Sequence, residues 1–257
     1  GKHEVITPQA DEIAFGFAPN HDETARLAFV GALKKFVNFD VENRLTTLFD
    51  EELVPAADRP PESREEAEAL VEGHPLYQLW GTLTFHSQNL LWDAVQVTSD
   101  RTIDAQVARY RALRDSGDRL GSIALSDELL VKAPVATTEI HRQPGGYWRE
   151  RRADDIEAAI NYSGTVELYR IAKGMAAGER PAPDSFGRFV ASVARKYAPD
   201  LEPTAVLDMG CGTGEQTLAY KREWPDAEVH GIDVARPFIR FAHAYAEEAG
   251  VPVHFAE

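Results

Sequence analysis

The chain of 257 residues is 44% hydrophobic, enough to bury a sizeable core in one large or two modest domains. Its 42 acidic against 27 basic residues give a formal charge of -15, which repels phosphate backbones and anionic membranes and disfavours partners of both kinds. The chain has a single cysteine, Cys211, which excludes an intrachain disulfide and a multi-cysteine zinc site. It shows no signal-peptide pattern, and no apolar run approaches the roughly 20 residues that are needed to span a membrane. We therefore expect a cytoplasmic protein.

The first half of the chain shows helical periodicity. Apolar residues at helical spacing predict an amphipathic helix over 22–37, with Asp22 as its cap, and a short helix over 64–71. The clearest pattern covers 76–95, where the 3.6-residue period persists for about five turns. The same spacing returns over 103–113. We expect these segments to form a mainly helical unit.

Three polar residues interrupt the apolar order of the 76–95 helix, namely His86, Gln88 and Asn89. They either line a pocket or occupy solvated positions, and the sequence favours neither. The eight histidines of the chain show no metal-ligand spacing. No metal site is therefore expected.

The middle of the chain changes character. Short β-branched runs at 130–131 and 135–140 predict one or two short strands between residues 122 and 140. A Pro-Gly-Gly turn then leads into a helical stretch over 153–176, and an apolar stripe over 186–197 predicts a further helix.

After Pro203 the pattern becomes strand, glycine turn, helix, strand, helix, strand. This alternation is typical of a parallel α/β sheet. The expected elements are 205–209, 214–224, 228–232, 237–248 and 251–255.

The candidate ligand-binding residues lie where the first of these strands is followed by a helix. Gly210, Gly212 and Gly214 occupy alternate positions there, which lets the backbone turn tightly and a ligand approach it closely. Asp208 precedes the turn, and Asp233 ends the next strand nineteen residues after Gly214. A carboxylate at that second position can accept both hydroxyl hydrogens of a ribose.

Two other interpretations compete with this one. A dinucleotide-binding turn has a third glycine at its sixth position, but this chain has Glu215 there, and an acid would repel a pyrophosphate. Asp208 instead favours a ligand that carries an ammonium or sulfonium group. Alternatively, the glycines only satisfy packing in a ligand-free turn and Asp233 only caps a helix.

The Asp208-x-Gly210-x-Gly212-x-Gly214 segment with Asp233 on the next strand resembles the class I S-adenosylmethionine-dependent methyltransferases. The resemblance covers roughly residues 185–257 and implies a Rossmann-like sheet. It also implies that the glycines cradle the methionine part of S-adenosylmethionine, with S-adenosylhomocysteine as product, that Asp233 holds the ribose and that Val234 packs on the adenine. Cys211 would contribute only its backbone. The implied cofactor-binding residues are Asp208, Gly210, Cys211, Gly212, Thr213, Gly214, Asp233 and Val234.

The resemblance also sets expectations for domain organisation. Residues 1–180 would form a mainly helical cap that selects the substrate, and residues 181–257 the N-terminal half of a Rossmann-like cofactor domain. A complete enzyme of this family continues for about four more strands. We therefore expect an incomplete catalytic domain, whose first strand is a long, apolar, unpaired edge, and a natural chain that continues beyond Glu257.

A His and a Tyr flank the Pro-Gly-Gly turn and are candidate catalytic residues. His141 would act as a general base and Tyr147 as an orienting hydroxyl; the alternative is a turn with surface side chains. On the following helix, Tyr162 and Tyr169 either touch the cofactor or belong to the core, with the core favoured for Tyr169.

These features together predict S-adenosylmethionine-dependent methyl transfer to a small-molecule acceptor, with a homodimer through the helical domain as a possible assembly. The alternatives are a non-catalytic cofactor-binding or scaffold protein and a protein or RNA methyltransferase, which would need a basic groove. The densest basic stretch, Arg149, Arg151 and Arg152, is short and interrupted by Glu150. We interpret it as structural.

Overall fold

The computed structural model describes residues 14–127, 131, 137–172 and 185–257. Within these residues, no helix has the length and apolarity needed to cross a membrane. The helices are α1 (His21–Lys35), α2 (Glu42–Leu48), α3 (Val54–Ala56), α4 (Arg64–Val71), α5 (Pro75–Arg114), α6 (Glu157–Ala172), α7 (Ser185–Tyr197), α8 (Glu215–Glu223) and α9 (Arg236–Glu248). The strands are β1 (Ser122–Ala124), β2 (Ala205–Met209), β3 (Glu228–Ile232) and β4 (His254–Ala256).

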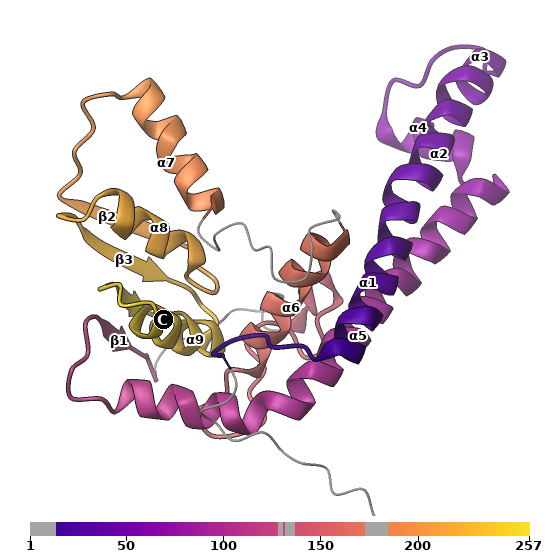
Figure 1. Ribbon diagram of the computed structural model, residues 1–257. Coiled ribbons are helices and arrows are strands. Elements are labelled where there is room, and N and C mark those ends of the chain that lie inside the picture. Colours follow the sequence, from indigo (N-terminus) through magenta and orange to yellow (C-terminus); the bar gives the residue numbers. More distant parts are fainter. Residues whose placement is uncertain (1–13, 128–130, 132–136, 173–184) are drawn as a thin grey trace, which may run out of the picture.

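The N-terminal helices form an elongated arm in which α1 lies along α5 (Figure 1). The cap of α1 is Asn20 rather than the predicted Asp22. Its side chain accepts from the Glu23 amide at 2.9 Å, and the Glu23 carboxylate accepts from the Asn20 amide at 2.9 Å, which is the reciprocal capping box that fixes a helix start. Helix α5 is continuous over 40 residues and joins the two periodic segments that the sequence shows.

The sheet is parallel, with strand order β1-β4-β3-β2. Strand β2 therefore lies at an edge of the described sheet, and Leu207 and Met209 are exposed along it. Strand β1 pairs with β4 and starts the region in which strands were predicted. The prediction at 135–140 is wrong for its described part, because Ile140–Arg142 forms a 3-10 helix; the run at 130–131 lies largely outside the described residues.

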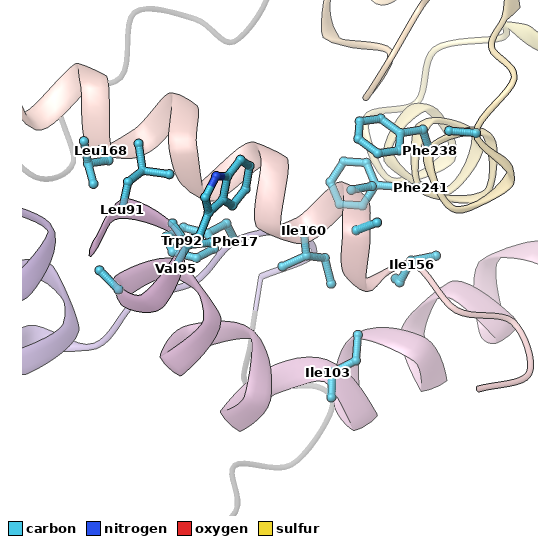
Figure 2. Close-up of a cluster of buried hydrophobic side chains, with 14 of the residues drawn as sticks. Phe17, Leu91, Trp92, Val95, Ile103, Ile156, Ile160, Leu168, Phe238 and Phe241 are labelled. Atoms are coloured by element: carbon cyan, nitrogen blue, oxygen red, sulfur yellow. The ribbon is translucent and has the colours of Figure 1, made fainter. Parts of the chain in front are cut away.

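Helix α9 is buried on two faces. Ile239, Ala242 and Ala246 belong to the core beneath the sheet, whereas Phe238 and Phe241 belong to the core formed with α5 and α6 (Figure 2). A helix that is apolar on both sides must be covered on both sides. Helix α9 thus holds the sheet against the helical part of the chain.

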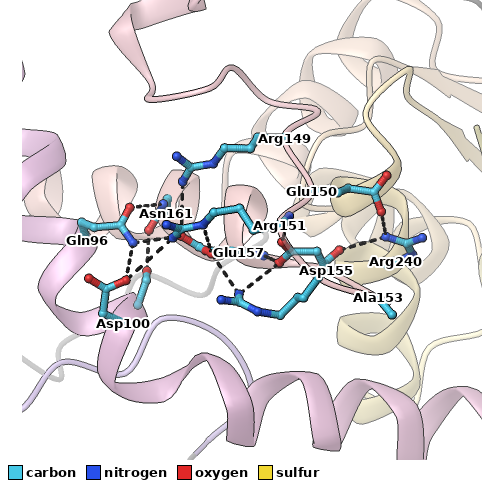
Figure 3. A network of polar contacts seen from close by, with 12 residues as sticks. Gln96, Asp100, Arg149, Glu150, Arg151, Ala153, Asp155, Glu157, Asn161 and Arg240 are labelled. Atoms are coloured by element: carbon cyan, nitrogen blue, oxygen red, sulfur yellow. Dashed lines mark hydrogen bonds and ion pairs between the residues drawn. The ribbon is translucent and has the colours of Figure 1, made fainter.

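A buried carboxylate ties α6 to the segment that precedes it. The Glu157 side chain is 1% exposed and pairs with Arg149, Arg151 and Arg152 (Figure 3). It also accepts from Gln96 of α5 at 2.9 Å. The structural interpretation of the basic stretch is confirmed, because its three cations neutralise one buried acid.

Burial by itself would raise the pKa of Glu157, but the bonds from Arg151 and Gln96 and the charges of Arg151 and Arg149 outweigh it and hold the pKa below its usual range. A carboxyl group whose pKa is lowered by folding stabilises the native state above its unfolded pKa. This contribution is lost as the pH falls from the ordinary glutamate value of 4.5 through the lowered pKa.

The variant Glu157→Gln should lower the free energy of unfolding at neutral pH by about 1–3 kcal/mol, because charged hydrogen bonds to a buried acceptor are lost. The matched control is Glu66→Gln, which breaks an exposed pair with Arg59 and should lower the free energy of unfolding much less, because solvent screens an exposed pair. Urea unfolding measures both. The gap between wild type and Glu157→Gln should narrow below pH 4.5, and a gap that is independent of pH would contradict this role for Glu157.

Candidate active site

The turn after β2 is fastened to the end of the neighbouring strand. The amides of Gly210 and Cys211 both donate to the Ile232 carbonyl, at 2.8 and 3.0 Å. The backbone φ angles are +76° at Gly210, +55° at Gly212 and +80° at Gly214. These left-handed conformations favour glycine at each position, so the alternate glycines are required by the path of the chain.

The three glycines differ in what surrounds them. A Cβ atom on Gly214 would lie 2.9 Å from the Ala242 Cβ and 3.1 Å from the Phe255 ring, so Gly214 serves packing. A Cβ on Gly210 would meet no atom within 4 Å, and one on Gly212 would meet only Phe238, at 4.0 Å. The packing alternative therefore explains Gly214 but leaves open space above Gly210 and Gly212.

Asp233 faces this turn from the end of β3. One carboxylate oxygen accepts from the Gly212 amide at 3.0 Å and the other from the Ala235 amide at 2.9 Å. Burial raises the pKa of Asp233 and the nearby charge of Asp208 adds to the effect, although the two backbone bonds oppose it. A carboxylate has about four acceptor sites, so Asp233 can bind further donors.

The remaining predicted cofactor residues lie around the same turn. Asp208 accepts a hydrogen bond from the Thr217 hydroxyl of α8 at 2.6 Å, which orients its carboxylate. Cys211 and Thr213 are buried. Burial and then the charges of Asp233 and Asp208 raise the pKa of the Cys211 thiol, which keeps it protonated and unreactive. Val234 is 48% exposed and offers an apolar surface beside Asp233.

An aromatic group connects the turn to the helical part of the chain. Phe238 of α9 lies beside Gly212 and contacts the rings of Tyr147 and Tyr162, at centroid distances of 5.4 and 5.5 Å. The rings of Tyr147 and Tyr162 are 5.8 Å apart. Burial is the main cause that raises the pKa of Tyr162, and the charges of Glu215 and Asp233 add to it. Tyr162 therefore lies close to the glycine turn.

Beyond Tyr147 and Tyr162 lies a cavity of about 480 Å³, within the size range of small-molecule sites. Its lining comes from α5, α6 and the 141–147 segment. Its lining is mostly aromatic and aliphatic. The lining residues are Thr84, Phe85, Gln88, Leu91, Trp92, His141, Arg142, Tyr147, Tyr162, Thr165, Val166 and Tyr169.

The two candidate catalytic residues come together at the edge of this cavity. The His141 Nδ1 atom and the Tyr147 hydroxyl form a hydrogen bond. Burial and then the neighbouring Tyr162 raise the pKa of Tyr147 to about 12, so its phenol stays protonated at neutral pH. The hydroxyl is thereby kept as a hydrogen-bonding group.

The backbone around His141 is strained. His141 and Arg142 have φ angles of +53° and +60°, conformations that cost free energy for residues with a side chain and concentrate at functional sites. Two donors from α5 hold this segment, because the His141 carbonyl accepts from Gln88 Nε2 at 2.9 Å and from Trp92 Nε1 at 2.8 Å.

The structure shows which of the polar residues of the 76–95 helix line the cavity and whether Tyr169 belongs to the core. Gln88 lines the cavity, and Asn89 accepts from Arg142 at 2.8 Å, whereas His86 is exposed. The core expectation for Tyr169 is wrong, because its side chain is 39% exposed and lines the cavity. Phe238 was missed, since an apolar residue in a helix stripe carries no signal of a neighbouring ligand site. Across the described residues, no His, Cys, Asp and Glu side chains cluster as a metal site.

Comparisons with known proteins show that the C-terminal segment is similar to methyltransferases. Residues 206–257 match the model of a methyltransferase domain. The chain is 38% identical over 69 residues to a malonyl-(acyl-carrier protein) O-methyltransferase of Herminiimonas arsenicoxydans. The matched segment covers 27% of this chain and 26% of the relative. The chain is 40% identical over 67 residues to a demethylmenaquinone methyltransferase of Thermus thermophilus, and this match covers 24% of the chain and 30% of the relative.

A third relative, trans-aconitate 2-methyltransferase of Pseudomonas paraeruginosa, is 52% identical over 31 residues, which cover 12% of this chain and 11% of the relative. The chain thus spans less than a third of the length of each of these relatives. The matched segment contains the glycine turn and Asp233. Together with the parallel sheet and the glycine turn, these matches identify residues 206–257 as part of a class I methyltransferase domain.

Proposed function

We propose that this chain binds S-adenosylmethionine at the turn after β2 and transfers its methyl group to a small molecule in the adjoining cavity. The observation that carries this proposal is the open space above Gly210 and Gly212. The Asp233 carboxylate faces that space, and Phe238 beside Gly212 contacts Tyr147 and Tyr162 of the cavity lining.

Each side of the turn matches one part of this ligand. The amides of the glycine turn and the Asp208 carboxylate would hold the methionine part, whose ammonium group favours an acid. Asp233 would accept from the ribose hydroxyls, and Val234 would cover one face of the adenine. The cofactor, when bound, supplies a methyl group on a positively charged sulfur.

The acceptor side depends on positioning. The acceptor atom forms its bond to the methyl carbon as the carbon–sulfur bond breaks, so holding it in line at about 3 Å supplies much of the rate. Tyr147 would orient the acceptor through its hydroxyl, and His141 would take a proton from an acceptor that must lose one.

The two parts of the proposed site come from different parts of the chain. Residues 1–180 would supply the acceptor cavity, and residues 181–257 the cofactor turn. The relatives are named for a malonyl group on a carrier protein, for demethylmenaquinone and for trans-aconitate. These names support an organic acceptor other than nucleic acid, in keeping with the formal charge of -15.

Calorimetric titration with S-adenosylhomocysteine tests the cofactor site. Wild type should show saturable binding at one site, and Asp233→Asn should bind roughly tenfold to a hundredfold more weakly, because hydrogen bonds to a charged acceptor are lost. The matched control is Glu228→Gln, an exposed acid at the opposite end of β3, which should bind like wild type. Equal affinities of wild type and Asp233→Asn would contradict the assignment.

The raised pKa of Asp233 predicts a pH dependence of this binding. Because Asp233 must be ionised to accept from the ribose, and its pKa lies above the ordinary 3.8, affinity should fall on acidification at a higher pH than for an ordinary aspartate. A pH series of titrations should show this fall in wild type and in Glu228→Gln. Asp233→Asn should lack it, and identical pH profiles would remove Asp233 from the site.

A further inference from the structure

The cavity is electrostatically uneven. No aspartate or glutamate is among the described residues that line it, although the whole chain has 42 acids against 27 bases. Two cations are associated with it instead: Arg142 is a lining residue, and Lys34 of α1 contacts the lining residues Gln88 and Tyr169. Lys34 is therefore beside Tyr169, and Arg142 contacts Phe85 and Asn89 of α5.

Lys34 is a buried cation that forms no ion pair within the part of the chain that the structure describes. Its side chain is 5% exposed, donates to Gln88 Oε1 at 2.8 Å and lies 5.7 Å from the centre of the Tyr169 ring. Among the described residues, no carboxylate forms an ion pair with it. Burial lowers the pKa of Lys34, which is the cost of a buried charge that an anion would offset.

Arg142 is also left without an acid in the described part of the chain. Its Nε donates to Asn89 at 2.8 Å, and its guanidinium lies 4.0 Å above the Phe85 ring. Other arginines of the helical part have carboxylate partners, as Arg101 has Glu23. A guanidinium has five N–H donors, so Arg142 can bind an anion without giving up these contacts.

The cavity adjoins the glycine turn at Tyr162. Tyr162 contacts Phe238 next to the glycine turn and is close to the acids Glu215 and Asp233. Tyr162 and Tyr169 both line the cavity from α6. They are seven residues apart, which along a helix is about 10 Å. The cavity therefore extends along about two turns of α6, from Tyr162 next to Phe238 to Tyr169 beside Lys34.

We propose that the cavity binds an organic acid with a flat aromatic or apolar body, whose carboxylate lies at the Lys34 and Arg142 end. This inference rests on the proposed function, since it names the acceptor class of the same site. The rings of Phe85, Trp92 and Tyr162 cover the body of this molecule. The group that accepts the methyl lies at the far end beside Tyr147, so the carboxylate anchors the acceptor and is not itself methylated.

The test uses two rod-shaped probes that differ in charge: the para,para isomer of hydroxybiphenyl carboxylate and the corresponding neutral carboxamide. Each is titrated calorimetrically into the protein without cofactor, for wild type, Lys34→Gln, Arg142→Gln and Lys35→Gln. Lys35 is the exposed neighbour of Lys34 on α1 and serves as the matched control for a lost positive charge.

Wild type and Lys35→Gln should bind the carboxylate roughly tenfold to a hundredfold more tightly than the carboxamide, as expected for hydrogen bonds to a charged group. Lys34→Gln and Arg142→Gln should lose most of this preference. Arg142 is exposed, so its variant decides the question if the replacement of buried Lys34 prevents folding. Equal affinities in wild type, no saturable binding of either probe, or a preference that Arg142→Gln retains in full would overturn the proposal.

The same variants separate this inference from the proposed function. Lys34→Gln and Arg142→Gln should bind S-adenosylhomocysteine like wild type, because neither residue is part of the glycine turn or is bonded to Asp233. If the carboxylate preference holds while S-adenosylhomocysteine does not bind, the acid site stands and the cofactor assignment is wrong. If S-adenosylhomocysteine binds but the carboxylate has no preference, only the acceptor class is overturned.

Discussion

The arrangement of the whole molecule depends on the two-sided burial of helix α9. Its Ile239 and Ala242 pack beneath the sheet, while its Phe238 and Phe241 pack against α5 and α6. Because neither apolar face can be left in water without a large free-energy cost, the sheet and the helical part must close on opposite sides of the same helix. This constraint brings the turn after β2 next to the cavity in the helical part.

Polar contacts reinforce this arrangement. Arg240 of α9 pairs with Glu150 and donates to the Asp155 carbonyl at 3.2 Å. The same segment contains the arginines that neutralise Glu157 of α6. These partly buried ion pairs join α9 and α6 to the segment between residues 149 and 157. The strained backbone at His141 is held on the same framework by donors from α5.

The sequence predicts much of this structure, and its failures have physical causes. The glycine turn, Asp233 and the elements around them follow from local chemistry, because positive φ angles and a strand-to-helix turn leave clear signals. Strand β1 has three residues, too few to show alternation. The closeness of Phe238 and Tyr162 depends on packing between distant segments, which no local pattern encodes. Tyr169 fits a helical stripe equally well whether that stripe faces a core or a cavity.

The proposed function places bound S-adenosylhomocysteine beside Tyr162, two helical turns from Tyr169. Fluorine NMR of fluorotyrosine-labelled protein tests it directly, with Tyr162→Phe and Tyr169→Phe used to assign the two signals. Titration with S-adenosylhomocysteine should shift the Tyr162 signal and leave that of Tyr169 in place, because the latter lies about 10 Å further along α6. A shift of the Tyr169 signal with an unchanged Tyr162 signal would contradict the account.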